Sequence, residues 1–178
     1  IKDGAKEAIR DMKQVGVRHT VMLTGDRREA AETVAQTLGI DEVHAELLPG
    51  GKVEQVEALL KAEKQKERLA FVGDGINDAP VLAGADVGAA MGTGADAAIE
   101  AADVVFMTSS MEAIPQSVTI AKATAAIAMQ NVVFALIVKG LVMILGLMGF
   151  ANMWLAVFAD TGVAMLCVLN SIRILYKK

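Results

Sequence analysis

The stretch Leu69-Ala70-Phe71-Val72, followed by Gly73-Asp74-Gly75-Ile76-Asn77-Asp78-Ala79-Pro80, is the most informative part of this chain. Its first four residues form a short apolar run, which predicts a buried strand. The eight that follow place two acids, Asp74 and Asp78, on a glycine-rich turn directly after that strand. Carboxylate oxygens are the ligands that Mg²⁺ prefers, and protein-bound Mg²⁺ commonly holds phosphate groups. We therefore interpret the segment as a magnesium and phosphoryl site at the end of a strand.

A dinucleotide-binding loop is the alternative interpretation of Gly73-Asp74-Gly75. Such loops follow the pattern Gly-x-Gly-x-x-Gly, which requires a third glycine where this chain has Asp78. A carboxylate at that place would repel a pyrophosphate. The spacing therefore favours a metal-assisted phosphoryl site.

Charged and apolar residues are unevenly distributed along the chain. The first ~110 residues hold most of the charge, whereas the last ~50 are nearly all apolar, which indicates a soluble unit followed by membrane segments. The composition agrees, with 54% hydrophobic residues and a mean hydropathy of +0.45. A net charge of −4 and the lack of a basic stripe argue against nucleic-acid binding. The single cysteine, Cys167, excludes an internal disulfide.

The soluble part alternates short apolar runs with amphipathic stretches. This pattern predicts helices at 3–15, 28–38 and 52–66, and strands at 20–23, 43–45, 69–72, 87–90 and 104–106. Strands that alternate with helices form a parallel sheet, and such sheets bind ligands beyond the carboxyl ends of their strands. Thr24 and Asp74 each follow a strand, so we expect both at one crevice.

Further candidates for that crevice come from three short motifs. Thr24-Gly25-Asp26 offers a hydroxyl and a close backbone approach to a phosphoryl oxygen, and Lys52 offers a positive charge at a helix start. Asn77 can orient neighbouring groups within the acidic turn. Taken alone, Thr24-Gly25-Asp26 is an ordinary turn or helix cap, and Lys52 alone is a solvated lysine. Together with Asp74 and Asp78 they form a set suited to phosphoryl transfer.

The apolar end of the chain predicts a membrane hairpin. A stalk helix is expected at 111–130, and transmembrane helices at 131–150 and 153–176, each long enough for a hydrocarbon core of ~30 Å. The short connection carries no Lys or Arg, whereas Arg173, Lys177 and Lys178 flank the exit. By the positive-inside rule, both ends of the hairpin and the soluble part are cytoplasmic.

Two charges lie inside the predicted spans, Lys139 in the first and Asp160 in the second. Counted from the hairpin midpoint at Ala151, their depths differ by only ~5 Å, so antiparallel helices can pair them. One interpretation is a structural ion pair that fixes the helix register. The other is a divalent-cation site, with Asp160 as ligand and Lys139 as the counter-ion that replaces the metal. His19 and His44 are interpreted as isolated surface or strand-edge residues without a role.

The soluble motifs resemble the later motifs of the haloacid-dehalogenase-like phosphorylation domain of P-type ATPases. The resemblance is carried by Thr24-Gly25-Asp26, Lys52 and Gly73 through Pro80, and by the runs 85–94 and 100–105. It implies a partial phosphorylation domain, with Asp74 as a Mg²⁺ ligand, Asp78 in support, and Thr24 and Lys52 on an aspartyl phosphate. ATP would be the phosphoryl donor. No Asp-Lys-Thr-Gly-Thr segment occurs, so a missing N-terminal remainder would supply the nucleophile and the nucleotide-binding domain.

The spans resemble the last two of zinc-, cadmium- and lead-exporting ATPases, through residues 135–139, residues 158–162 and Asn170. This implies Zn²⁺ or Cd²⁺ as cargo and a multi-pass protein of the plasma membrane. Copper exporters would instead show Tyr-Asn and Met-Ser-Ser in these spans, and neither is present. A membrane-tethered phosphatase and a non-catalytic fragment that needs a partner segment remain alternatives. Whether the chain is the C-terminal part of a pump or a non-catalytic fragment, we expect the isolated chain to be inactive.

Overall fold

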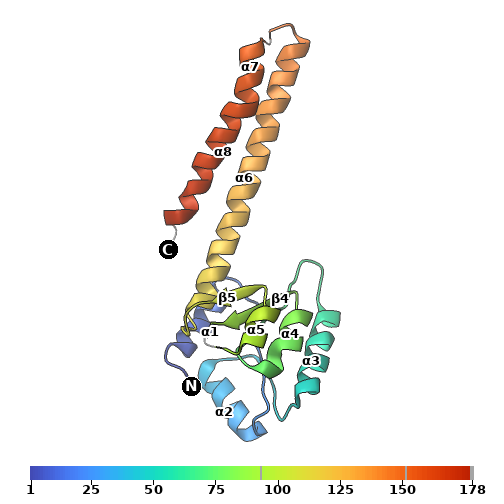
Figure 1. Cartoon of the computed structure of the whole chain (residues 1–178), viewed down its shortest axis with the longest axis vertical. Coiled ribbons are helices and arrows are strands. Elements are labelled where there is room, and N and C mark those ends of the chain that lie inside the picture. Colours follow the sequence, from blue (N-terminus) through green and yellow to red (C-terminus); the bar gives the residue numbers. More distant parts are fainter. Residues whose placement is uncertain (93, 151, 177–178) are drawn as a thin grey trace. The chain divides into compact units, whose positions relative to one another are not determined.

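The structure of the protein is a computed structural model that describes residues 1–92, 94–150 and 152–176 (Figure 1). Four residues named in the sequence interpretation lie outside the described residues. They are Thr93 of the run 85–94, Ala151 of the hairpin connection, and Lys177 and Lys178 of the basic exit. The chain divides into two compact units, Ile1–Pro115 and Gln116–Lys178. Each unit is described in turn.

The first unit is an α/β structure with parallel strands, as predicted. Strand β1 (Val21–Leu23) pairs with β2 (Glu42–His44), and β3 (Ala70–Gly73), β4 (Val87–Met91) and β5 (Val104–Phe106) form a second sheet. The strand order is β1-β2 in one sheet and β3-β4-β5 in the other. The expected single sheet is thus divided in two, because within the described residues β1 and β3 each pair along one edge only.

Within the described residues, α1 (Ala5–Gln14) precedes β1, and four further helices connect the strands: α2 (Arg28–Leu38), α3 (Pro49–Ala62), α4 (Ala79–Gly84) and α5 (Asp96–Ala101). Helix α2 is followed by Gly39, whose φ of 77° is the left-handed conformation that glycine adopts at a helix end. Helix α3 begins at Pro49 rather than at the predicted Lys52, because proline is pre-organised for the first turn of a helix. The new start places Lys52 one turn inside the helix.

The core of the first unit lies on both faces of β4. Ala90 packs with Leu82 and Ala98 of the covering helices α4 and α5. Ala89 and Met91 pack with Phe106 and Ile114 on the other face. A Cβ added at Gly88 would lie 2.4 Å from the carbonyl oxygen of Leu82, so glycine is needed for α4 to approach the strand. This packing fixes the loops at the carboxyl ends of β3 and β4.

The second unit is a helical hairpin. Helix α6 (Ala113–Leu147) is continuous across the predicted junction between stalk and span, and its first turn belongs to the first unit. The return helix consists of α7 (Met153–Val157), a π-helical turn (Phe158–Gly162), α8 (Val163–Ile172) and a 3₁₀ turn (Arg173–Tyr176). Both Ala113–Leu147 and Met153–Tyr176 are long and apolar enough to cross a membrane. The Asn152 side chain caps α7 by accepting a hydrogen bond from Leu155 N–H at 2.9 Å.

Candidate functional site

Thr24 lies directly after β1, where its hydroxyl closes a tight turn. Thr24 Oγ1 donates to Asp26 Oδ2 at 3.0 Å and accepts from the Asp26 N–H at 3.1 Å. The neighbouring loop is held close, because Leu47 N–H donates to the Thr24 carbonyl at 3.0 Å. A Cβ at Gly25 would lie 3.2 Å from the Leu47 carbonyl oxygen. The turn therefore joins the loop that leads into α3 and Lys52.

Lys52 and Asp78 form the most buried ion pair among the described residues. Lys52 Nζ donates to Asp78 Oδ1 at 2.8 Å, and the two side chains are 20% and 11% exposed. Asp78 Oδ2 accepts from the Gly75 N–H at 3.3 Å. A Cβ at Gly73 would lie 2.9 Å from the Asp78 Cβ, so the glycines of the turn leave room for this carboxylate. Asp78 thus anchors Lys52 and its own turn, while Asn77 beside it is exposed.

Asp74 is the open carboxylate of the turn. Its side chain is 60% exposed, and Lys2 Nζ lies 3.9 Å from Asp74 Oδ2. The main chain is fixed, because the Asp74 carbonyl accepts from the Ala95 N–H at 3.0 Å. A Cβ at Gly94 would lie 2.6 Å from that same carbonyl oxygen. The loop after β4 therefore holds Asp74 in place without covering its carboxylate.

The donor set fits a magnesium ion that is shared with a phosphoryl group. Among the described residues, no group of three or more His, Cys, Asp or Glu side chains converges to hold a metal without other ligands. Mg²⁺ usually binds through one or two protein carboxylates, with water and substrate phosphate as the remaining ligands. Asp74 meets that requirement. Asp78 Oδ1 is engaged by Lys52, so Asp74 is the more open carboxylate of the two.

The two charges predicted inside the spans lie together in the hairpin. Lys139 Nζ is 3.1 Å from Asp160 Oδ1, and the side chains are 53% and 78% exposed. The predicted pairing is confirmed. Asp160 is in the π-helical turn, and a Cβ at Gly162 would lie 2.7 Å from the Phe158 ring. Such turns are often found at functional positions of helices.

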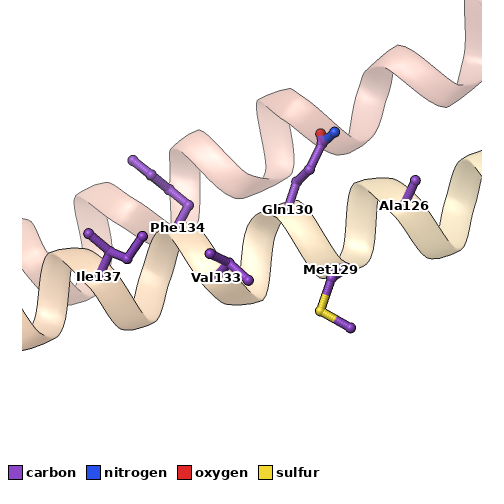
Figure 2. A pocket seen from close by; sticks show the side chains of 6 residues that line it. All are labelled: Ala126, Met129, Gln130, Val133, Phe134 and Ile137. Carbon is purple, nitrogen blue, oxygen red and sulfur yellow. The ribbon is translucent and has the colours of Figure 1, made fainter.

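Helix α6 also carries an open, largely apolar pocket on its surface (Figure 2). Gln130 is the polar residue of its lining; the others are Ala126, Met129, Val133, Phe134 and Ile137. Exposed apolar side chains continue along both helices, among them Met143, Met148 and Met165. A face of this kind suits lipid or another transmembrane helix.

Sequence reasoning missed two polar groupings in the first unit. The Lys2 contact with Asp74 joins residues too far apart in sequence for a local motif. His19 and His44 are not isolated, because their Nε2 atoms lie 2.8 and 2.9 Å from the Glu42 carboxylate. The hydrogen bond from the His19 ring is the main reason that the pKa of Glu42 is lowered. Side chains alternate between the two faces of a strand, so Glu42 and His44 of β2 lie on the same face. This alternation was the sequence signal that could have predicted their contact.

Comparisons with known proteins agree with this geometry. Residues 1–86 match the haloacid dehalogenase-like hydrolase family. The chain is 52% identical to a cadmium, zinc and cobalt-transporting ATPase of Bacillus subtilis (strain 168), with 100% of this chain and 26% of the relative covered. It is 54% identical to a zinc-transporting ATPase of Synechocystis sp., with 98% and 24% covered.

A solved structure extends the match to both units. The crystal structure of a zinc-transporting PIB-type ATPase in the E2.Pi state superimposes with a TM-score of 0.90 at 40% identity, covering 98% of this chain and 28% of that one. In sequence and fold, the chain matches part of zinc- and cadmium-transporting ATPases. It spans about a quarter of the length of the curated relatives it matches.

Proposed function

We propose that this chain belongs to an ATP-driven exporter of divalent heavy-metal ions, and that it carries the magnesium-binding motifs and part of the membrane cation site. The observation that supports this most is the Lys139–Asp160 pair at 3.1 Å in a hairpin that follows a phosphatase-type head. A tethered phosphatase gives no reason for two opposite charges within apolar helices. The cost of placing charge in lipid makes a functional role the simplest account.

In the soluble unit, each side chain has a distinct role in phosphoryl transfer. Asp74 would hold Mg²⁺, which supplies charge neutralisation on the phosphoryl oxygens when it is bound. Lys52 directs its ammonium at the same oxygens and is kept in place by Asp78. The Thr24 hydroxyl donates to a phosphoryl oxygen once it is released from Asp26. Gly25, Asp26 and Asn77 shape the surrounding turns.

The attacking carboxylate would come from another segment of the same polypeptide. Strands β1 and β3 belong to different sheets, and an additional parallel strand between them would complete one continuous sheet. A nucleophile at its carboxyl end would face Thr24 and Asp74, because parallel strands present their carboxyl ends at one edge. That remainder would also contain the ATP-binding domain.

In the membrane unit, Asp160 is a ligand for the transported Zn²⁺ or Cd²⁺. A carboxylate suits these ions better than Cu⁺, which prefers sulfur. Lys139 pairs with the Asp160 carboxylate after the cation leaves, so no unpaired charge remains in lipid. The lysine and arginine distribution supports a cytoplasmic position of the soluble unit, and the plasma membrane is the proposed location.

The test is metal-dependent ATP hydrolysis by the intact protein in lipid. Zn²⁺ or Cd²⁺ should stimulate Mg²⁺-dependent hydrolysis, and Cu⁺ should not. Hydrolysis of small phosphoesters without any response to heavy metals would instead identify a tethered phosphatase. If the intact protein shows neither activity, the proposal is wrong.

A further inference from the structure

A network of amide hydrogen bonds joins α6 to α8 on the side of the ion pair away from the hairpin turn. Asn170 Nδ2 donates to Asn131 Oδ1 at 2.8 Å. Asn131 Nδ2 donates in turn to Ser171 Oγ at 2.9 Å and to the Cys167 carbonyl at 3.2 Å. We call the pair Asn131 and Asn170 the asparagine clamp. It links two positions that are 39 residues apart in sequence.

The clamp is completed at both ends by further contacts. Arg173 NH1 donates to Asn170 Oδ1 at 2.9 Å, and Cys167 Sγ lies 3.7 Å from the Asn131 carbonyl oxygen. Each amide therefore has partners for both its oxygen and its nitrogen. In an apolar environment a half-satisfied amide is costly, so this arrangement favours one relative position of the two helices.

The ion pair by itself fixes the helices less well. Both of its side chains are more than half exposed, and a lysine ammonium on a flexible stem can follow a carboxylate over several ångströms. The hairpin turn does not fix Asp160 either, because Asp160 lies within the π-helical turn. One extra residue per turn changes the rotation of everything that follows. A contact beyond that turn is needed to set where Asp160 points.

We propose that the asparagine clamp is a positioning pair that holds α8 in register with α6, so that Asp160 stays opposite Lys139. Asn131 lies about two turns before Lys139, and Asn170 about three turns after Asp160, so neither reaches the cation site. The clamp acts through the register of the helices. Its consequence for metal affinity depends on the proposed function, whereas its effect on the Lys139–Asp160 contact does not.

The first experiment measures that contact directly in the present chain, reconstituted in phospholipid nanodiscs. A membrane-permeant carbodiimide activates the Asp160 carboxylate, and the Lys139 amine displaces the resulting urea to form an amide, which mass spectrometry of the linked peptides quantifies. We expect Asn131→Ala and Asn170→Ala to lower the yield about fivefold or more, the equivalent of one interhelical hydrogen bond. Asn170→Gln keeps an amide and should recover much of the loss.

The matched control is Thr124→Ala on the same helix, because Thr124 Oγ1 donates to the Ile120 carbonyl of its own helix. The control should retain the wild-type yield. An unchanged yield in both asparagine variants would overturn the proposal, and so would an equal loss in Thr124→Ala.

The second experiment uses the intact protein. The Zn²⁺ concentration for half-maximal stimulation of ATP hydrolysis should rise about tenfold in Asn131→Ala and Asn170→Ala, with no further rise in the double variant. Phosphorylation by inorganic phosphate without metal should stay within about twofold of wild type, because the clamp does not touch the soluble site. Parallel loss of both activities would contradict a positioning role. If the wild type shows no metal response but the cross-linking result holds, the proposed function fails and the clamp stands.

Discussion

Lys139 and Asp160 form an ion pair across the two apolar helices, with Lys139 Nζ 3.1 Å from Asp160 Oδ1. The pair brings together the only acid and the only lysine between residues 123 and 176. An isolated charge at this depth is costly in lipid, and pairing reduces the cost. A cation that displaces Lys139 would restore the balance of charge at Asp160. The contact therefore links helix packing to the proposed cargo.

The 178-residue chain by itself should hydrolyse no ATP. The reason is physical: β1 and β3 lie in separate sheets, and the strand that we expect to carry the nucleophile is not among the described strands. Purified chain in detergent or nanodiscs, assayed with Mg²⁺ and ATP, provides the measurement. Mg²⁺-dependent hydrolysis above that of an Asp74→Asn control would show that a nucleophile is already present.

Asp74→Asn in the intact protein should reduce Mg²⁺-dependent phosphoenzyme formation about 100-fold or more. The substitution keeps the shape of the side chain but removes the charge that would hold the metal. Phosphoenzyme formation is measured across a range of Mg²⁺ concentrations. Glu100→Gln, at an exposed acid of α5, is the control and should behave as wild type. Normal Mg²⁺ dependence in Asp74→Asn would remove this residue from the site.

Lys52→Ala should lower the free energy of unfolding of the first unit by about 3 kcal/mol, because it leaves the Asp78 carboxylate buried without its counter-ion. Denaturant unfolding followed by circular dichroism measures the loss. The matched control is Lys61→Ala, also on α3, whose contact with Glu57 is exposed at 3.8 Å and should contribute less than ~1 kcal/mol. Equal losses for the two lysines would contradict a structural role for the Lys52–Asp78 pair.

Acid should destabilise the first unit through Asp41. Hydrogen bonds from the Lys13 ammonium and from Thr20 hold the pKa of Asp41 well below its ordinary value of 3.8. A carboxyl group whose pKa is lowered by folding stabilises the protein above the unfolded pKa, and this contribution is lost as the pH falls below about 4. Asp41→Asn should flatten the decrease in unfolding free energy between pH 5 and 3. The exposed Asp3→Asn should keep the wild-type slope; an equal flattening there would contradict the assignment.

Much of the fold could be predicted because its signals are local. Apolar runs and helical periodicity predicted parallel strands, and the depth count predicted the Lys139–Asp160 contact, which the structure confirms. Three features were not predictable. The start of α3 at Pro49 decides that Lys52 reaches Asp78. The π-helical turn leaves no mark in hydrophobic periodicity. The division into two sheets depends on a strand that the described chain does not contribute.

The roles assigned to Thr24, Gly25, Asp26 and Asn77 stay predictions. Thr24 and Asp26 bond to each other, so a phosphoryl group would have to compete with Asp26 for the hydroxyl. A pairing of this kind depends on side-chain rotamers, which a sequence pattern does not determine.

The most direct test of the central claim is transport by the intact protein in sealed, inside-out vesicles. We predict that ATP-dependent Zn²⁺ accumulation is lost in Asp160→Ala, while phosphorylation of the same variant by inorganic phosphate persists, because Asp160 lies in the membrane unit and the phosphoryl site in the soluble one. Zn²⁺ accumulation at the wild-type rate in Asp160→Ala would contradict the account.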